Sequence, residues 1–79
     1  MDELVNFSSA LEALKSGYRV SRKGWNGVGQ YVELQTPTET SKMGRPYLFI
    51  SPVDGILVPW IASQTDLLAE DWQVLASYV

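Results

Sequence analysis

The sequence predicts an α+β fold, in which a small antiparallel sheet of about five strands combines with an N-terminal helix and a short second helix. Apolar residues recur at helical spacing near the N-terminus, and several later segments alternate between inward-facing and outward-facing residues. Residues typical of turns separate these segments. The chain has 79 residues with no repeat and no linker, so we expect residues 1–79 to form one small domain.

The first predicted element is a helix in the segment FSSALEALKSG. Its apolar residues recur at helical spacing, and they are Ala10, Leu11, Ala13 and Leu14. Ser9 followed by Glu12 fits a capping box, and Ser8 is an alternative N-cap. Gly17 suits the left-handed position that commonly ends a helix.

Two strands are predicted on either side of a glycine-rich loop. The segments Tyr18–Arg22 and Tyr31–Gln35 both alternate, which is typical of half-buried strands. The residues that we expect to face inward are Tyr18, Val20, Val32 and Leu34. Residues Thr36–Pro46 then have the composition of an exposed loop.

Two further strands are apolar on both faces. They are Tyr47–Ser51 and Ile56–Val58, and the link Pro52–Gly55 has the chemistry of a tight turn. Pro59 should end the second strand, because proline cannot donate to a strand ladder. One layer of core covers only one face of such strands. The other face needs a second layer or a second subunit, which favours a homo-oligomer.

The last part of the chain predicts a short helix and a final strand. Ser63 followed by Asp66 has the spacing of a capping box and leads into an apolar run. The segment Trp72–Leu75 alternates and indicates a strand, in which we expect Trp72 to be a core residue.

Composition excludes several classes of protein and site. Cysteine and histidine are both absent, so disulfides, thiolate or imidazole metal sites and the usual base–nucleophile pairs cannot form. The net charge of −3 disfavours binding to duplex nucleic acid. No apolar run approaches the roughly 20 residues of a membrane span, and the N-terminus is acidic where a signal peptide is basic. We expect a soluble cytoplasmic protein without cofactor, metal or membrane contact.

The glycine-rich loop GWNGVGQ is the first candidate binding segment. Its glycines let backbone N–H groups approach a ligand, and Trp25 offers a ring on which a base can stack. Alternatively, Asn26 and Gly27 form a simple hairpin turn with Trp25 folded back as a lid. These residues alone do not favour either interpretation.

Two more segments are candidates for binding a small phosphorylated ligand. In PWIASQTD, the helix start presents free N–H groups, although Ser63 and Asp66 can satisfy these themselves. Gln64 and Thr65 have no such structural duty, and Trp60 is either a core residue or a ring for stacking. Arg45 in the long loop can clamp a phosphate or simply be solvated.

Nothing in the sequence indicates catalysis. Asp66 and Glu70 lie one helical turn apart and form the nearest acidic pair. Helix capping and solvated charge explain this pair better than acid–base chemistry does. We therefore predict a protein that binds without catalysis.

Together, the residues ALEALKSGYRVSRKGWNG and ILVPWIASQTDLLAEDWQVL resemble the second Thoeris anti-defense family of small phage and prophage proteins. The resemblance extends from Phe7 to Leu75, apart from the variable middle loop. Its motifs are RKGWNG and PWIASQTDLLAEDW, in this order. The family positions that these motifs match are Trp25, Asn26, Gly27, Trp60, Ser63, Gln64, Thr65 and Asp66.

This resemblance implies a function that composition does not reveal. Proteins of the family bind a cyclic ADP-ribose isomer, which the TIR-domain sensor of Thoeris defence makes, and hold it without cleaving it. An NAD-depleting effector in the infected bacterium then receives no signal. The family forms homotetramers with ligand pockets at subunit interfaces, and some members sequester cyclic oligonucleotides.

The middle segment Thr36–Pro46 is shorter than in longer relatives and departs there from the family pattern. Two other functions fit a small sheet with exposed aromatic residues. One is a module for single-stranded nucleic acid, which the acidic balance disfavours. The other is a protein-binding inhibitor that uses Tyr47 and Phe49 as anchors.

Overall fold

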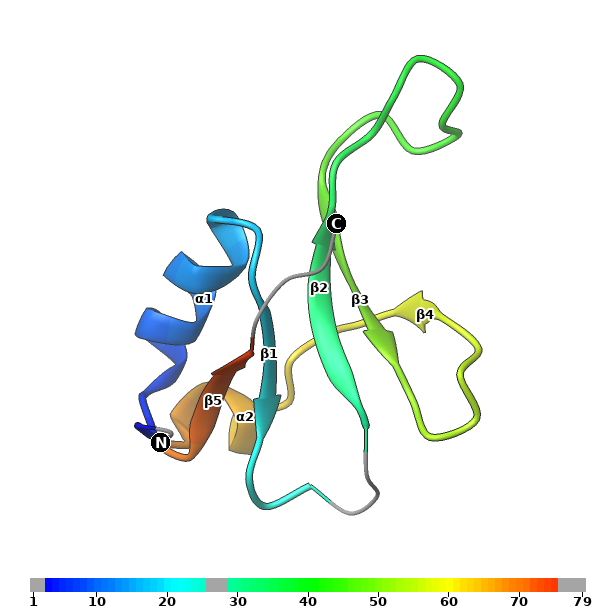
Figure 1. Ribbon diagram of the computed structural model, residues 1–79. Coiled ribbons are helices and arrows are strands. Elements are labelled where there is room, and N and C mark those ends of the chain that lie inside the picture. Colours follow the sequence, from blue (N-terminus) through cyan, green and yellow to red (C-terminus); the bar gives the residue numbers. More distant parts are fainter. Residues whose placement is uncertain (1–2, 26–28, 76–79) are drawn as a thin grey trace.

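A computed structural model describes residues 3–25 and 29–75 of the chain. It shows a five-stranded antiparallel sheet with two helices, which confirms the predicted α+β class (Figure 1). The strand order is β4-β3-β2-β1-β5. In chain order the elements are α1 (Phe7–Lys15), β1 (Arg19–Arg22), β2 (Tyr31–Gln35), β3 (Tyr47–Ser51), β4 (Val58–Pro59), α2 (Gln64–Leu68) and β5 (Trp72–Leu75).

Helix α1 begins earlier than either predicted cap. Asn6 has extended backbone geometry, and its side chain accepts a hydrogen bond of 3.0 Å from the backbone N–H of Ser9. The predicted capping box of Ser9 and Glu12 and the alternative cap Ser8 are therefore wrong. Asparagine is as good an N-cap as serine, and the earlier start places Phe7 in the first turn, where its ring contacts other aromatic residues.

The end of α1 agrees with the prediction for Gly17. This residue has a φ of 96°, in the region that glycine adopts without strain. The N–H of Gly17 bonds to the carbonyl of Leu14, and the N–H of Tyr18 bonds to the carbonyl of Ala13. This is the Schellman arrangement, which turns the chain directly from the helix into β1.

Strands β2, β3 and β5 have the predicted bounds. β1 begins one residue later than expected, and Tyr18 is 45% exposed instead of facing inward, because it belongs to the helix stop. β4 is shifted toward Pro59, which is its last residue as predicted. The predicted turn is present, with the N–H of Gly55 bonded to the carbonyl of Pro52 at 2.9 Å.

The register of the sheet separates its two faces. Val58, Ile50, Val32, Val20 and Val74 pair across the five strands, so their side chains share one face. Helix α1 packs on this face against β1, β2 and β5, as Figure 1 shows. The fully buried core is made of Ala10, Leu14, Val20, Val32 and Trp72.

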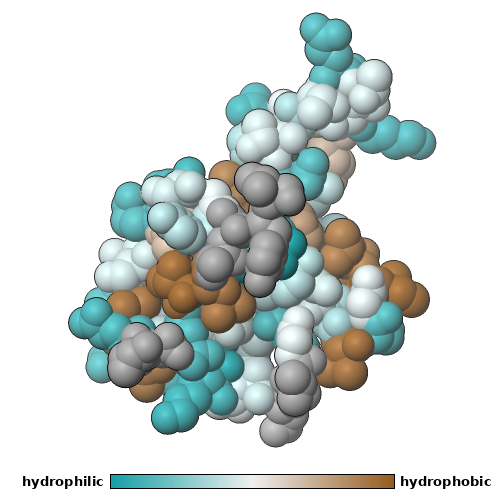
Figure 2. Space-filling model, in the orientation of Figure 1, coloured by the Kyte–Doolittle hydropathy of each residue, from teal (hydrophilic) through white to brown (hydrophobic). Residues whose placement is uncertain are grey.

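The opposite face of the sheet carries the other side chains of each strand. On β3 these include Tyr47 and Phe49, which confirms that this strand is apolar on both faces. Neither described helix packs there, because α1 lies on the first face and α2 contacts α1. Further apolar side chains are exposed before β4, where Figure 2 shows a hydrophobic surface, and they are Val53, Ile56 and Leu57. Val58 is also exposed, but its pairing with Ile50 places it on the first face.

Within residues 3–25 and 29–75, neither helix combines the length and the apolar character that a membrane crossing requires.

Candidate functional site

Four aromatic rings from distant parts of the chain meet on the first face of the sheet. Trp72 is completely buried, and its ring centroid lies 5.4 Å from that of Phe7. Trp25 and Trp60 meet Trp72 edge to face, with centroids 5.5 Å and 6.0 Å away. Such tilted pairs are favourable beyond the area they bury. The cluster therefore joins α1, the glycine loop, the segment after β4 and β5.

The three tryptophans differ in exposure, and this difference separates their roles. Trp72 is the core residue that we predicted, and its indole N–H donates to the carbonyl of Asp66 at 3.0 Å. Trp25 and Trp60 are only half-buried, so part of each ring is open to a ligand. Of the two sequence-based interpretations of Trp25, the ring folded back is the one that its contact with Trp72 supports, and Trp25 packs against the core.

The start of α2 lies beside this cluster and has the predicted capping box. The hydroxyl of Ser63 accepts from the N–H of Asp66, and the Asp66 carboxylate accepts from the N–H of Ser63, both at 3.0 Å. These two side chains therefore satisfy two backbone N–H groups at the helix start, those of Ser63 and Asp66. Gln64 and Thr65 are exposed next to them and can face a ligand.

An ion-pair network connects α2 to the glycine loop. The guanidinium of Arg22 donates from Nε to Asp71 at 2.8 Å and from Nη1 to Asp66 at 3.1 Å. The second oxygen of Asp71 accepts from the backbone N–H of Gly24 at 2.9 Å. One arginine thus binds two carboxylates, and each carboxylate also holds a backbone N–H.

The network changes the ionisation of its members. The hydrogen bond from Arg22 is the largest cause that lowers the pKa of Asp71 below its usual value, and the Gly24 N–H adds to this effect. Burial alone would raise the pKa of Asp66. Hydrogen bonds from Ser63, Arg22 and the Trp25 side chain outweigh burial, and the pKa of Asp66 is lowered. Both carboxyl groups are therefore ionised at neutral pH.

The structure brings together some of the predicted binding residues and leaves others apart. Trp25, Trp60 and the α2 start form one region around Trp72. Asn26 and Gly27 lie outside the described residues. Arg45 is exposed in the loop before β3. That loop is at the opposite end of β2 from the glycine loop, because Tyr47 pairs with Gln35 at the end of β2 (Figure 1).

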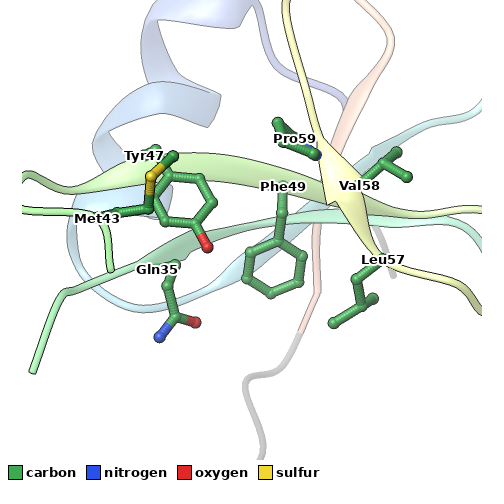
Figure 3. A pocket seen from close by; sticks show the side chains of 7 residues that line it. All are labelled: Gln35, Met43, Tyr47, Phe49, Leu57, Val58 and Pro59. Carbon is green, nitrogen blue, oxygen red and sulfur yellow. The ribbon is translucent and has the colours of Figure 1, made fainter. Parts of the chain in front are cut away.

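An apolar hollow lies on the opposite face of the sheet from the aromatic cluster. It has a volume of about 140 Å³ and is shown in Figure 3. Its lining residues are Gln35, Met43, Tyr47, Phe49, Leu57, Val58 and Pro59. None of these side chains is charged, so the hollow offers no charged partner for a phosphate. It suits apolar contact with another protein surface. Of the two anchors that the sequence predicted for such contact, Tyr47 is partly exposed, whereas Phe49 is only 9% exposed.

Sequence reasoning placed Arg22 just before the glycine loop, but it missed the pairing of Arg22 with Asp71 and the role of Phe7 in this region. Phe7 completes the aromatic cluster, and it was hidden by the misplaced helix start. Arg22 and Asp71 are 49 residues apart in the chain, and no local spacing relates them. Only the register of β1 with β5, which pairs Arg22 with Trp72, brings them together.

In the part of the chain that the structure describes, no three His, Cys, Asp or Glu residues gather as a metal would require. Asp66 is engaged in its cap and with Arg22, whereas Glu70 is exposed. The arrangement therefore offers stacking surfaces and hydrogen-bonding groups for binding.

Comparison with known proteins reveals a clear similarity. A family model described as the Thoeris anti-defense 2-like domain matches residues 5–75. A curated protein named Thoeris anti-defense 2, from Bacillus phage SP01, is 33% identical to the chain over 89 residues. That match covers 96% of this chain and 100% of the phage protein. The matched residues include the whole aromatic cluster and the start of α2.

Proposed function

The chain belongs to the Thoeris anti-defense 2-like family, and from this membership we propose that it sequesters a cyclic ADP-ribose-type signalling nucleotide without cleaving it. The signal is the one made by a TIR-domain sensor in an infected bacterial cell. Its capture in the cytoplasm keeps an NAD-depleting effector inactive. The protein then acts by stoichiometry, since each occupied site removes one signal molecule.

The observation that carries this proposal is the pair of half-buried indoles beside the start of α2. Trp25 and Trp60 both contact the buried Trp72, which restricts how their rings can move. A pre-ordered ring loses little entropy when a base stacks on it. Stacking of one base on an aromatic ring contributes roughly 1–3 kcal/mol. Two such rings in one region therefore suit a nucleotide.

Polar groups next to the rings suit the rest of the ligand. Gln64 and Thr65 are exposed at the start of α2, and their side chains can hydrogen-bond to ribose hydroxyls or phosphate oxygens. In the proposed site, Ser63 and Asp66 hold this segment in place through their capping box.

The carboxylates near the rings support binding without cleavage. Hydrolysis of a glycosidic bond commonly uses a carboxylic acid that donates a proton to the leaving group. Asp66 and Asp71 are both paired with Arg22, and the pKa of each is lowered, so neither holds a proton at neutral pH. These two groups are therefore poor general acids.

The proposal includes assembly into a homotetramer with ligand pockets between subunits. Arg45 is remote from the aromatic cluster of its own chain. In an oligomer, the Arg45 of one copy can reach the aromatic cluster of a neighbouring copy. Association also covers the apolar hollow over β2, β3 and β4. These features support the assembly that the family resemblance implies.

A calorimetric titration tests the ligand class. The protein should bind a cyclic ADP-ribose isomer tightly and should not bind single-stranded DNA. Cyclic dinucleotides and trinucleotides form parallel arms, because tight binding of one of these instead would assign the protein to another signalling system. Absence of heat with every nucleotide would leave a protein-binding role and overturn the proposal.

A second experiment separates sequestration from catalysis. The complex is heated to denature the protein, and the released ligand is analysed by mass spectrometry and by its ability to activate the effector. We expect the ligand to be recovered unchanged, and inhibition to scale with the molar ratio of protein to signal. A linear or hydrolysed nucleotide produced by substoichiometric protein would reveal an active site.

A further inference from the structure

We propose that Arg22 is a positioning residue, which fixes the glycine loop at Gly24 and Trp25 relative to the start of α2. The consequence for ligand binding rests on the proposed function, because these two segments are the sides of the proposed site. The connection that Arg22 makes between the two segments exists in the protein without ligand, and it does not depend on that function.

A continuous chain of hydrogen bonds connects the two segments through one guanidinium. On one side, the Gly24 N–H donates to Oδ2 of Asp71, and Oδ1 of Asp71 accepts from Nε of Arg22. On the other side, Nη1 of Arg22 donates to Oδ1 of Asp66, and Oδ2 of Asp66 accepts from the Ser63 N–H. Every link is between 2.8 and 3.1 Å long.

Each end of this chain is next to residues of the proposed site. Gly24 directly precedes Trp25, whose own N–H bonds to the carbonyl of Arg22 at 3.2 Å. The N–H of Lys23 bonds to the carbonyl of Asp71 at 3.0 Å, so Asp71 holds the loop at two points. Ser63 directly precedes Gln64 and Thr65 in the sequence. A shift of the guanidinium therefore moves both sides of the site.

Arginine suits this position because of its shape. The guanidinium is planar and presents its N–H groups in a fixed fork, whereas the lysine ammonium is a single compact charge on a flexible stem. The network is also shielded, since the side chains of Arg22 and Asp66 are only 17% and 13% exposed. Lysine at this position would keep the charge and lose the fixed distance between the two carboxylates.

The same geometry makes Arg22 unsuited to binding a ligand phosphate directly. Its single positive charge is shared by two ionised carboxylates, so the cluster as a whole is negative. A phosphate placed there would meet net repulsion. Arg22 therefore acts through the segments that it holds and not through its own charge.

The test compares two charge-conserving substitutions in the same strand. Arg22→Lys replaces the planar guanidinium, which bonds to both carboxylates, with a single ammonium group. Arg19→Lys is the matched control, because Arg19 also lies in β1 and pairs with a carboxylate, Glu33, at 3.1 Å, but on the other face of the sheet. Its side chain is 23% exposed, close to the value for Arg22.

The first measurement is amide hydrogen exchange of the ligand-free proteins, read at Gly24 and Ser63. We expect Arg22→Lys to accelerate exchange at both amides, while the amide of the buried Val32 reports any global loss of stability. Arg19→Lys should leave Gly24 and Ser63 as in the wild type. Unchanged exchange in Arg22→Lys, or faster exchange at Gly24 alone, would refute the bridge.

The second measurement is affinity for a cyclic ADP-ribose isomer, at a temperature where every variant is folded. Hydrogen bonds to charged groups are strong enough that we expect Arg22→Lys to weaken binding about tenfold, with Arg19→Lys near wild type. Equal affinity of Arg22→Lys and wild type would show that the bridge does not position the site. If the wild type itself does not bind, the proposed function fails, and the exchange experiment alone decides the structural claim.

Discussion

Trp25 has a structural role, and the proposed function gives it a second role in ligand binding. Its ring packs edge to face on Trp72, so it contributes to the fold. The residue is also partly exposed, and it belongs to the proposed site. Substitution should therefore affect both stability and binding, and the two effects have to be measured separately.

We expect Trp25→Ala to weaken nucleotide binding about 5- to 150-fold, from the loss of roughly 1–3 kcal/mol of base stacking. The melting temperature should also fall, because the contact with Trp72 is lost. Calorimetry well below the melting temperature isolates the affinity. Trp25→Phe is the control, since it keeps an aromatic face and should retain most of the binding. Wild-type affinity in Trp25→Ala would exclude the ring as a stacking platform.

The carboxylates bound to Arg22 predict how stability depends on pH. The pKa values of Asp66 and Asp71 are lower in the folded protein than in the unfolded chain. In acid the unfolded chain therefore binds more protons, and stability rises with pH. The stabilisation is complete above the unfolded pKa of about 4 and is lost as pH falls through the folded values.

Urea unfolding of wild type and Asp71→Asn across the acid range checks this prediction. The variant lacks one of the two linked carboxyl groups, so its stability should be lower at neutral pH and should decline less steeply in acid. Parallel curves for the two proteins would mean that Asp71 does not contribute to the pH dependence.

At the scale of elements, the capping of α1 is specific to one side chain. Asn6 accepts from Ser9 N–H, whereas the side chains of Ser8 and Ser9 are exposed. Asn6→Ala should therefore lower the free energy of unfolding by about 0.5–2 kcal/mol. Ser8→Ala is the matched control and should change it little, because alanine is a good helix former. Chemical denaturation gives both values, and similar losses in the two variants would contradict the cap.

The same elements show how much of the fold the sequence could predict. Alternation identified β2 and β5 with their bounds, because burial on one face imposes that period. β3 was identified as a short run of apolar residues, because both of its faces carry apolar side chains. The second helix was predicted through Ser63 and Asp66, whose capping signal is local. The start of α1 was misplaced, because several adjacent polar residues are chemically able to cap a helix and the choice depends on where Phe7 packs.

The candidate site could be predicted only where its chemistry is local. The motifs around Trp25 and Trp60 were visible in the sequence, but the contact of both rings with Trp72 depends on the assembled sheet. Arg22 bonds to two carboxylates that lie 44 and 49 positions further along the chain, those of Asp66 and Asp71. The members of this network are ordinary charged residues, and nothing in their own neighbourhood marks them as partners.

At the scale of the whole molecule, the second face of the sheet is the face on which no described helix packs. It carries apolar side chains that neither described helix covers, and α1 is already committed to the first face. For a chain of 79 residues, a second copy is the simplest cover. We therefore predict that light scattering coupled to size exclusion gives an oligomeric mass, which the proposed family assembly sets at four subunits.

Leu57→Asp tests which surface holds the oligomer together. Leu57 is 54% exposed and lines the apolar hollow, so a charge there should cost the isolated subunit little but should oppose association through burial of an unpaired carboxylate. The control is Leu68→Asp, at a residue of α2 that is 78% exposed and lies outside the hollow. We expect the mass to fall in Leu57→Asp and to stay at the wild-type value in Leu68→Asp. If Leu57→Asp keeps the full mass, the second face is not the interface. If the wild type is itself a monomer at micromolar concentration, pockets shared between subunits cannot form, and Arg45 has no route to the aromatic cluster.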